Sequence, residues 1–301
     1  SIDYIGSLLA SLAFPTFLLP VLGVNQTAFL MGLLNIGVAG MLLYTFGHRL
    51  NINWKNRLWV VWVVVTGIMI IGSLFSVNIA RFFEQQLYSA VIVYEEQTPM
   101  QRIIMTRGAG DDLRLFINGN IQFSSRDEYR YHEMLVHPIM SVARTHETVL
   151  VLGGGAGLVA RELLKYEDVE HIIVVDLDPA ITDLAKTYPL LVQVNQNAMN
   201  DERVSVVNQD AFKFLEESNE LYPVIIIDLP DPNNETLSKL YSTAFYKLVN
   251  QHLTRDGAFI TQATSPYFAR EAFWTIVETI EVSDFQVLPL RTHVPSFGEW
   301  G

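Results

Sequence analysis

The sequence has no cysteine among its 301 residues. This absence excludes disulfide bonds, thiolate metal sites and a cysteine nucleophile, and it leaves the redox compartment undetermined. Basic residues are also scarce, since 20 Lys and Arg stand against 32 Asp and Glu, for a formal net charge of −12. A surface of that charge repels nucleic acid and suits cationic ligands, although it serves solubility equally well.

Charged side chains are nearly absent from the first 80 residues. Among Asp, Glu, Lys and Arg, that part contains Asp3, Arg49, Lys55 and Arg57 alone. Residues 81–301 therefore carry 31 acids and 17 bases, a net charge of −14. The two parts of the chain are adapted to different surroundings.

Three apolar runs fill the first part, at residues 5–22, 27–46 and 58–80. Each is close to the ~20 residues that a helix needs to cross a bilayer. Pro15 and Pro20 should kink the first run, and such kinks persist in lipid only where neighbouring helices satisfy the freed carbonyl groups. We therefore expect about three packed transmembrane helices in residues 1–80, with the lipid bilayer of the cell membrane as a partner.

Residues 81–148 predict a juxtamembrane helix and a small β-rich subdomain. Three β-prone runs are separated by turn residues, and Asn118-Gly119 is a strong hairpin signal. We expect a small antiparallel sheet that covers one side of a ligand site. Ser124 or Ser125 is expected to cap the helix that follows, whose Tyr, His, Glu and Arg side chains fit either a solvated face or a substrate-facing one. The β-prone runs are residues 90–94, 101–106 and 114–117.

The chain is organised around an apolar run, 149–152, that breaks into glycines and then into helix formers. Glycines between a strand and a helix allow a tight turn and close approach of a ligand to main-chain N–H groups. A second apolar run ends in Asp176, 21 residues after Gly155. An acid at that spacing holds ribose hydroxyls in Rossmann-type sheets, and the alternative is a βαβ unit without a ligand.

Residues 149–301 predict a Rossmann-like, methyltransferase-type catalytic domain of the α/β class. The fully apolar run 224–227 suits a central parallel strand, and it leads into Asp228-Leu229-Pro230-Asp231. Ligands bind at the carboxyl ends of such strands, so two carboxylates should lie beside the glycine loop, unless they serve only as turn caps. The remaining alternation predicts strands at 204–208, 258–262 and 285–290 and helices at 179–188, 238–251 and 269–278.

Together these motifs resemble the spermidine synthase family of polyamine aminopropyltransferases over residues 88–301, and the apolar helices resemble its membrane-anchored branch. The resemblance implies that an amine of putrescine or a related polyamine attacks the aminopropyl carbon of decarboxylated S-adenosylmethionine and releases methylthioadenosine. It implies no permanently bound cofactor, and it implies a homodimer. No Cys-rich or His-rich metal pattern is present in the sequence, and its acidity disfavours nucleic acid as a partner. The motifs are Gly153–Gly155, Asp176–Pro179, Gln209–Phe212, Asp228–Pro232 and Tyr131–Met134, with 125–133 and 265–270 for the membrane-anchored branch.

The resemblance also implies roles for single residues. Asp231 matches the catalytic base, Tyr131 assists it, and Asp228 helps to hold the amines. The other implied positions are Gly153, Gly154, Gly155, Ala156, Asp176, Asp210 and Gln101 for the adenosyl donor, and His132, Gln122 and Gln262 for the acceptor pocket.

Ala156 departs from the family pattern, in which Gly-Gly-Gly is followed by an Asp that holds the amine of the donor. Loss of a carboxylate that pairs with a buried ammonium weakens binding strongly. Three explanations of Ala156 compete: a substitution that disables the enzyme, a natural homologue with lost or changed activity, and a change of donor to S-adenosylmethionine. A methyltransferase, a lyase or a non-catalytic adenosyl-ligand sensor are therefore the alternatives, although two carboxylates favour polyamine chemistry.

The side of the membrane is ambiguous. The basic residues between the second and third runs favour a cytoplasmic loop, which would place the catalytic domain outside. A donor made in the cytosol favours the opposite, and we expect a cytoplasmic catalytic domain. Because residues 285–301 contain little of the last strand of a methyltransferase-type sheet, we also expect a truncated sheet and a natural protein that continues past Gly301.

Overall fold

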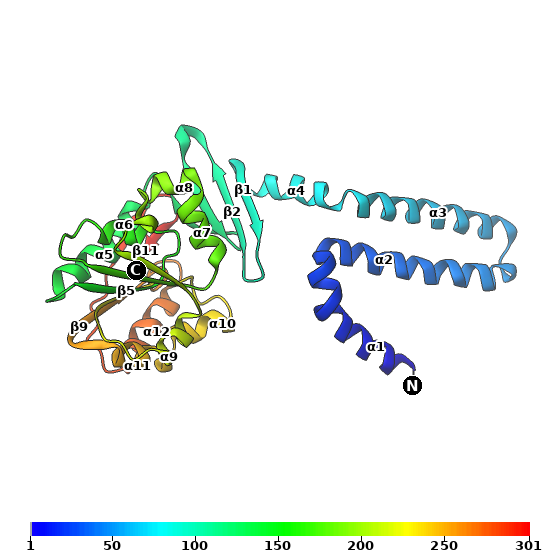
Figure 1. Cartoon of the computed structure of the whole chain (residues 1–301). Helices are drawn as coiled ribbons and strands as arrows, with labels where there is room; N and C mark the ends of the chain where they lie inside the picture. Colours follow the sequence, from blue (N-terminus) through cyan, green and yellow to red (C-terminus); the bar gives the residue numbers. More distant parts are fainter. Residues whose placement is uncertain (1) are drawn as a thin grey trace. The chain divides into compact units, whose positions relative to one another are not determined.

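The computed structural model describes the backbone of residues 2–301 and the side chains of residues 4, 6–18, 21–23, 25–76, 78–79, 82–83 and 85–301. The chain forms two compact units that divide between Ser89 and Ala90 (Figure 1). This division lies nine residues beyond the boundary expected at residue 80. The small β-rich part belongs to the same unit as the large sheet.

The first unit is helical. Its helix α2 is irregular at Gly23, where φ is 71°, so the chain turns at the predicted start of the link between the first two apolar runs. Pro15 lies in a π-helical turn, and the Thr27 hydroxyl donates to the carbonyl of Leu18 at 3.1 Å, which satisfies one group near the break. The elements are α1 (Ile2–Ala13), η1 (Phe14–Leu18), α2 (Leu19–Phe46), η2 (Gly47–Arg49), α3 (Ile52–Leu74) and α4 (Ser76–Leu87).

Two helices in the described residues are long and apolar enough to cross a membrane, Asn25–Arg49 and Ile52–Leu74. The first apolar run gives only the shorter helix Gly6–Leu18, so the expectation of three full spans is corrected to two helices of that length. The third predicted run also shifts, because helix α3 begins before Leu58 and ends at Leu74. Length and composition alone are weak evidence for a membrane segment.

The second unit begins with a four-stranded antiparallel sheet in the order β1-β2-β3-β4. The predicted hairpin is confirmed, since Asn118 and Gly119 both have positive φ (50° and 81°), as a tight hairpin turn requires. The strands are β1 (Val91–Gln97), β2 (Arg102–Arg107), β3 (Leu113–Ile117) and β4 (Asn120–Ser124), with the short helix η3 (Ala109–Asp111) before β3.

The predicted serine cap is wrong. Helix α5 (Tyr129–Val142) begins after Glu128 and has no side-chain cap hydrogen bond. The Ser124 hydroxyl donates to Asp112 at 2.6 Å, and Ser125 Oγ accepts the backbone N–H of Leu113 at 2.9 Å. Both serines are used by the small sheet, because Ser124 ends β4 and the N–H of Ser125 donates to the carbonyl of Leu113 at 2.8 Å.

The large sheet is parallel, with the order β7-β6-β5-β8-β9, which confirms the predicted α/β class. Its strands are β5 (Thr148–Gly153), β6 (His171–Asp176), β7 (Val204–Asn208), β8 (Tyr222–Asp228) and β9 (Leu253–Thr261). The helical elements are α6 (Leu158–Leu163), α7 (Pro179–Thr187), α8 (Pro189–Val194), η4 (Ala198–Asn200), α9 (Ala211–Glu217), α10 (Glu235–Ser238), η5 (Lys239–Tyr241), α11 (Thr243–Gln251) and α12 (Arg270–Glu281).

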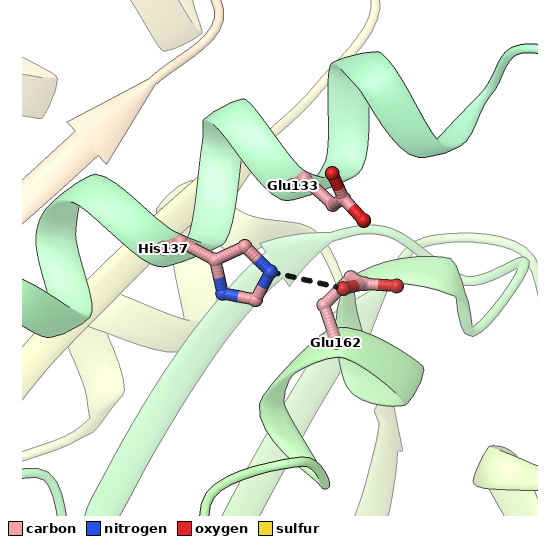
Figure 2. A group of neighbouring side chains, drawn as sticks. All are labelled: Glu133, His137 and Glu162. Carbon is pink, nitrogen blue, oxygen red and sulfur yellow. Dashed lines mark ion pairs between the residues drawn. The ribbon is translucent and has the colours of Figure 1, made fainter.

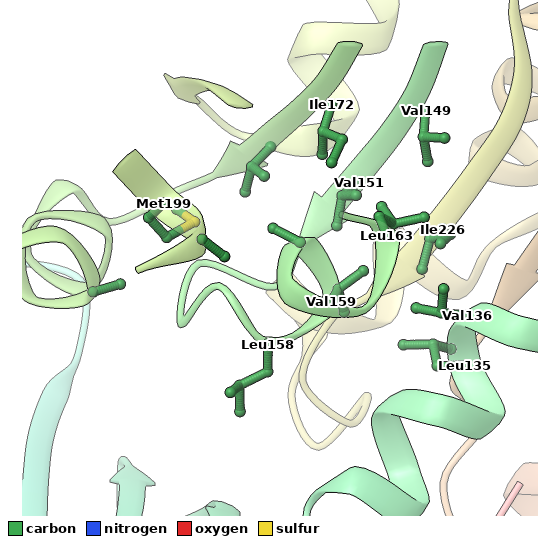
Figure 3. Packing of buried hydrophobic residues seen from close by; sticks show 14 of the residues in the cluster. Leu135, Val136, Val149, Val151, Leu158, Val159, Leu163, Ile172, Met199 and Ile226 are labelled. Carbon is green, nitrogen blue, oxygen red and sulfur yellow. The ribbon is translucent and has the colours of Figure 1, made fainter. Parts of the chain in front are cut away.

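Hydrophobic side chains pack on both faces of this sheet. Val149 and Val151 of β5 face one cluster with Leu163 of α6 (Figure 3). Leu150, from the same strand, faces the other cluster with Phe245. Alternate residues of a strand point to opposite faces, so a continuously apolar strand is buried on both sides. This packing fixes the carboxyl ends of β5, β6 and β8 relative to one another.

Two predicted elements after β8 differ from the structure. The helix expected at 238–251 divides into η5 and α11 because Ser242 Oγ accepts the N–H of Phe245 at 3.3 Å and starts a new helix. The strand expected at 285–290 is absent from the described residues. Pro289 has no N–H for a sheet ladder, and Phe285 packs on Phe259 at 4.6 Å between ring centroids. A hairpin follows, formed by β10 (Thr292–Val294) and β11 (Gly298–Trp300).

Candidate active site

The glycine loop lies directly against the end of strand β8. Gly153 has φ 85°, and a Cβ there would lie 2.8 Å from the carbonyl carbon of Asp228. The N–H of Gly154 donates to the carbonyl of Asp228 at 3.2 Å. A side chain at Gly153 would therefore separate the loop from Asp228, and the predicted proximity of the glycine loop to this acid is confirmed.

Asp176 lies at the carboxyl end of β6 and binds the same glycine loop. Its carboxylate accepts the N–H of Gly155 at 2.9 Å and the N–H of Asp178 at 3.1 Å. Burial raises the pKa of Asp176 to about 6. The acid thus has the position that the spacing predicted, and its role toward ribose remains a prediction.

The small sheet is tied to the Asp176 loop by a buried hydrogen bond that the sequence did not reveal. The Thr98 hydroxyl donates to Asp178 at 2.7 Å, and the same hydroxyl oxygen accepts the N–H of Gln101 at 2.9 Å. The turn that carries Gln101 is therefore anchored beside Asp176. Gln122 has a different setting, since its side-chain amide donates to the carbonyl of Asn120 in its own strand at 3.2 Å.

Tyr131, in the first turn of α5, reaches the end of β8. Its hydroxyl donates to Asp228 at 2.6 Å. Burial, and then the nearby Asp228, raise the pKa of Tyr131 well above its usual value, so the phenol stays protonated at neutral pH. The structure brings together two of the predicted site residues that are 97 positions apart in the sequence.

Asp231 has a different environment from Asp228. It accepts a hydrogen bond from the amide of Gln262 at 3.2 Å, and the same amide lies 2.7 Å from the Leu229 carbonyl and 2.6 Å from the Tyr241 hydroxyl. Burial raises the pKa of Asp231, while hydrogen bonds from Gln262 and Thr264 act in the opposite direction. Tyr241 was missed from the sequence because no local motif marks it.

Asp210 is predicted to contact adenine, and in the structure it caps helix α9. Its carboxylate accepts the N–H groups of Phe212 and Lys213, at 2.9 and 3.2 Å, and pairs with Lys239 at 2.7 Å. Burial acts to raise the pKa of Asp210, but the hydrogen bond from Lys239 and those from the backbone lower it. The residue lies at the correct edge of the sheet, two positions after the end of β7.

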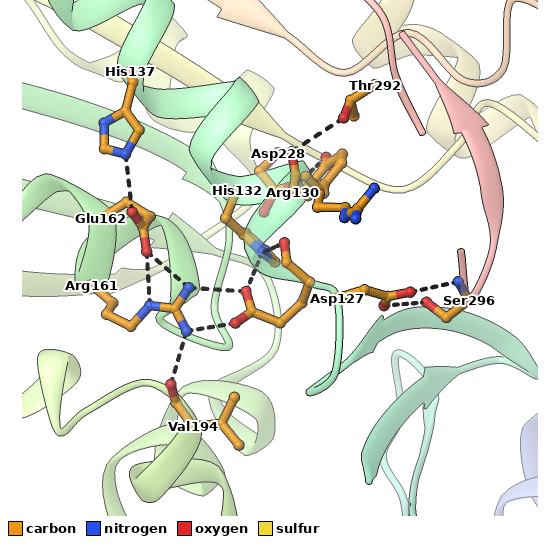
Figure 4. A network of polar contacts seen from close by, with 12 residues as sticks. Asp127, Arg130, His132, His137, Arg161, Glu162, Val194, Asp228, Thr292 and Ser296 are labelled. Carbon is orange, nitrogen blue, oxygen red and sulfur yellow. Dashed lines mark hydrogen bonds and ion pairs between the residues drawn. The ribbon is translucent and has the colours of Figure 1, made fainter. Parts of the chain in front are cut away.

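His132, predicted in the acceptor pocket, lies instead in a buried ionic network (Figure 4). Its Nδ1 donates to the Glu128 carboxylate at 2.8 Å, and Arg161 binds that carboxylate with two nitrogens. His132 is 4% exposed, so its contact with the site is indirect, through the ring of Tyr131 at 5.0 Å. Sequence reasoning missed Arg161, although the Arg161-Glu162 pair, enclosed by apolar residues on a short helix, could have indicated a buried ion pair.

A neighbouring cluster has the composition of a metal site. Ligand atoms of Glu133, His137 and Glu162 lie within 4.8 Å of one another (Figure 2). However, the buried Glu162 carboxylate already pairs with Arg161 at 2.9 Å and with Lys165 at 2.5 Å. Because these cations balance the acid, the arrangement favours an ion-pair cluster over a metal centre.

The β10–β11 hairpin adds aromatic rings around Tyr131. The rings of Phe297 and Trp300 lie 6.3 and 6.0 Å from it, in edge-on orientation. Asp127, just before α5, holds the hairpin by accepting the N–H and the hydroxyl of Ser296 at 2.7 and 2.6 Å. A cavity of about 130 Å³ lies against Tyr131 and Trp300. Sequence reasoning missed these rings because it considered this stretch only as the end of a sheet.

The parallel sheet, the glycine loop after β5 and the acid at the end of β6 define the Rossmann-like class of α/β proteins. Within that class, the spermine/spermidine synthase domain family matches residues 128–301. The chain belongs to this family.

Full-length relatives support the assignment. A polyamine aminopropyltransferase of Oceanobacillus iheyensis is 46% identical over 99% of this chain and 58% of its own length. One from Leptospira interrogans is 46% identical over 100% of this chain and 60% of its own length. The chain thus spans less than two thirds of these relatives.

Solved structures agree with the fold. A spermidine synthase in complex with the transition-state analogue AdoDATO has a TM-score of 0.63 at 27% identity, covering 69% of this chain and 71% of that one. The spermidine synthase of Thermotoga maritima has a TM-score of 0.61 at 27% identity, covering 69% of this chain and 70% of its own.

Proposed function

We propose that the protein transfers an aminopropyl group from decarboxylated S-adenosylmethionine to putrescine or a related polyamine. The observation that carries the proposal is the pair of carboxylates, Asp228 and Asp231, on one loop against the glycine loop. A polyamine is cationic at neutral pH, so it requires anionic groups where its nitrogen meets the donor. The names of the relatives point to the same chemistry.

In this mechanism Asp231 removes a proton from the attacking ammonium group. The free amine then displaces methylthioadenosine from the aminopropyl carbon, so a C–N bond forms as the C–S bond breaks. A partly buried carboxylate with a raised pKa is a stronger base than a fully exposed one, which suits Asp231 to this step. Asp228, with its phenol partner Tyr131, holds the cationic acceptor.

The donor would bind along the carboxyl ends of β5, β6 and β7. Asp176 accepts the ribose hydroxyls, Gln101 contacts the nucleoside from the small sheet, and Asp210 faces adenine. The acceptor chain would lie beside Tyr131, whose hydroxyl contacts Asp228, and the nearby rings of Phe297 and Trp300 suit its methylene groups.

Ala156 favours a second candidate, a reaction of S-adenosylmethionine itself. At this position the family has an acid for the donor's amine, and Ala156 supplies no charge. A chain that binds S-adenosylmethionine more tightly than the decarboxylated donor would be a methyltransferase, a lyase or a sensor. The two acceptor carboxylates favour aminopropyl transfer.

We further propose that α2 and α3 cross the cell membrane as a pair and that the α/β unit is cytoplasmic. Few of their side chains are buried in the described structure, which leaves apolar surface that lipid could cover. The Trp62 indole donates to the carbonyl of Ile36 at 2.8 Å, which holds the two helices together. Protease protection of tagged chains in sealed vesicles tests the crossing and its side.

The test of the activity compares the full chain with Ala156→Asp in detergent. Calorimetry measures binding of decarboxylated S-adenosylmethionine, S-adenosylmethionine and methylthioadenosine, and a turnover assay with putrescine follows. We expect the variant to bind the decarboxylated donor at least tenfold more tightly and to form spermidine, with unchanged methylthioadenosine affinity. Preference of both chains for S-adenosylmethionine, without spermidine, would overturn the proposal.

A further inference from the structure

A buried guanidinium joins the helix after the glycine loop to the first turn of α5. Nη1 and Nη2 of Arg161 donate to the two oxygens of Glu128 at 2.7 and 3.0 Å. The same side chain donates to the Val194 carbonyl at 3.0 Å and to Glu162 at 3.0 Å (Figure 4). Arg161 and Glu128 are 8% and 4% exposed, so water screens this two-pronged pair very little.

Glu128 controls the start of α5. Its carbonyl accepts the N–H groups of Tyr131 and His132 at 3.0 Å each. Its carboxylate, besides pairing with Arg161, accepts the Nδ1–H of His132 at 2.8 Å. Both ends of Glu128 are therefore fixed, and the backbone from which Tyr131 projects is fixed with them. Burial opposes ionisation, but hydrogen bonds from His132 and Arg161 lower the pKa of Glu128.

Tyr131 needs this support because its contact spans two elements. Its hydroxyl lies 2.6 Å from the carboxylate of Asp228, the last residue of strand β8. Arg161 belongs to α6, which starts at the glycine loop, and that loop binds the Asp228 carbonyl through Gly154. A continuous series of contacts therefore leads from Tyr131 through Glu128, Arg161 and the glycine loop back to Asp228, the partner of the Tyr131 hydroxyl.

We propose that Glu128 and Arg161 are positioning residues that hold the Tyr131 phenol against Asp228, so that the polyamine meets a preformed phenol–carboxylate pair. This inference rests on the proposed function. Neither residue needs to contact the substrate, because both act through Tyr131. A merely structural ion pair would instead stabilise the fold independently of Tyr131.

A double-mutant cycle tests the proposal. Glu128→Gln, Tyr131→Phe and the combined variant are prepared in whichever background, Ala156 or Ala156→Asp, has the higher putrescine turnover. We expect Glu128→Gln to lower kcat/KM for putrescine about 10- to 100-fold, and to lower it less than threefold further once Tyr131 is Phe. If Glu128→Gln lowers kcat/KM by the same factor with Tyr131 and with Tyr131→Phe, the positioning role is refuted.

Arg161→Lys is the second variant, since it keeps the charge but loses the two-pronged contact. It should show the same dependence on Tyr131. Asp112→Asn is the matched control, a buried carboxylate whose bonds go to Ser124 and Arg114 of the small sheet. It should leave kcat/KM unchanged.

Two further measurements separate the possible failures. Thermal unfolding and methylthioadenosine binding show whether each variant is folded with its nucleoside site intact. If the parent binds methylthioadenosine but neither binds nor converts putrescine, the proposed function fails and the positioning role fails with it. If the parent is active and the effect of the combined variant on kcat/KM equals the product of the effects of Glu128→Gln and Tyr131→Phe, only the positioning role is wrong.

Discussion

The contact between Gly155 and Asp176 gives a quantitative prediction for nucleoside binding. In Gly155→Ala, the new Cβ would lie 2.7 Å from Cγ of Asp176 and 2.9 Å from Cγ2 of Ile181. Carbon atoms pack at about 3.5–4.0 Å. Because Ile181 prevents the loop from moving away from Asp176, the carboxylate of Asp176 must move away from the new Cβ by about 1 Å.

That retreat breaks the hydrogen bond from the Gly155 N–H, which measures 2.9 Å. A hydrogen bond to a charged group contributes about 1.5–3 kcal/mol, so loss of one ribose hydroxyl contact by the displaced carboxylate corresponds to about 10- to 150-fold in affinity. Because the same carboxylate is proposed to hold ribose, we expect methylthioadenosine to bind about 100-fold more weakly to Gly155→Ala.

Calorimetry at pH 7.5 measures the effect, with thermal unfolding to show that the variant is folded. Gly108→Ala is the matched control, since its Cβ would meet its nearest atom at an ordinary 3.5 Å and its φ is −102°. Affinity of folded Gly155→Ala within twofold of the parent would refute the assignment of Asp176 to ribose.

Three further predictions concern the same site. Asp231→Asn should lower putrescine turnover about 10²- to 10⁴-fold in steady-state kinetics while methylthioadenosine affinity stays constant, because a base acts only in the chemical step; an equal loss of both would exclude that role. Tyr131→Phe should lower kcat/KM for putrescine about 10- to 150-fold by removing a hydrogen bond to a carboxylate, and an effect below threefold would contradict the contact with Asp228. Burial raises the pKa of Asp176 to about 6, and ribose hydroxyls donate to its ionised form, so methylthioadenosine affinity should fall as pH drops from 7 to 5. Calorimetry across that range checks this, and Asp176→Asn should show a flat profile.

The sheet could be predicted because its signals are local. A continuously apolar strand, a glycine break and an acid at the next strand end depend on neighbours within about 30 residues, and Asp176 and Asp228 lie where these patterns put them. The same holds for the hairpin at Asn118-Gly119.

Contacts between distant segments could not be predicted in the same way. Ser124 and Ser125 fit a helix cap equally well by sequence, and only their contacts with β3 show that the small sheet uses them, Ser124 in the β4 pairing and Ser125 through its N–H to the Leu113 carbonyl. The apolar residues of 285–290 suggest a strand, yet in the described residues they join no sheet although β9 is an edge strand, and Pro289 has no N–H to donate to such a ladder. Arg161 and Glu128 are 33 residues apart, and no spacing rule links them.

The two carboxylates on the β8 loop divide their proposed roles because their surroundings differ. Asp228 accepts a hydrogen bond from the Tyr131 phenol, which stays protonated and fixes the position of this carboxylate, so its proposed role is to hold the cationic acceptor. Asp231 is partly buried and accepts a hydrogen bond from the Gln262 amide, and its raised pKa favours proton uptake. Two acids in contrasting environments are the general way in which one site both binds and deprotonates. On the proposed assignment, both acids for the acceptor are present in this chain, and the departure at Ala156 concerns the donor.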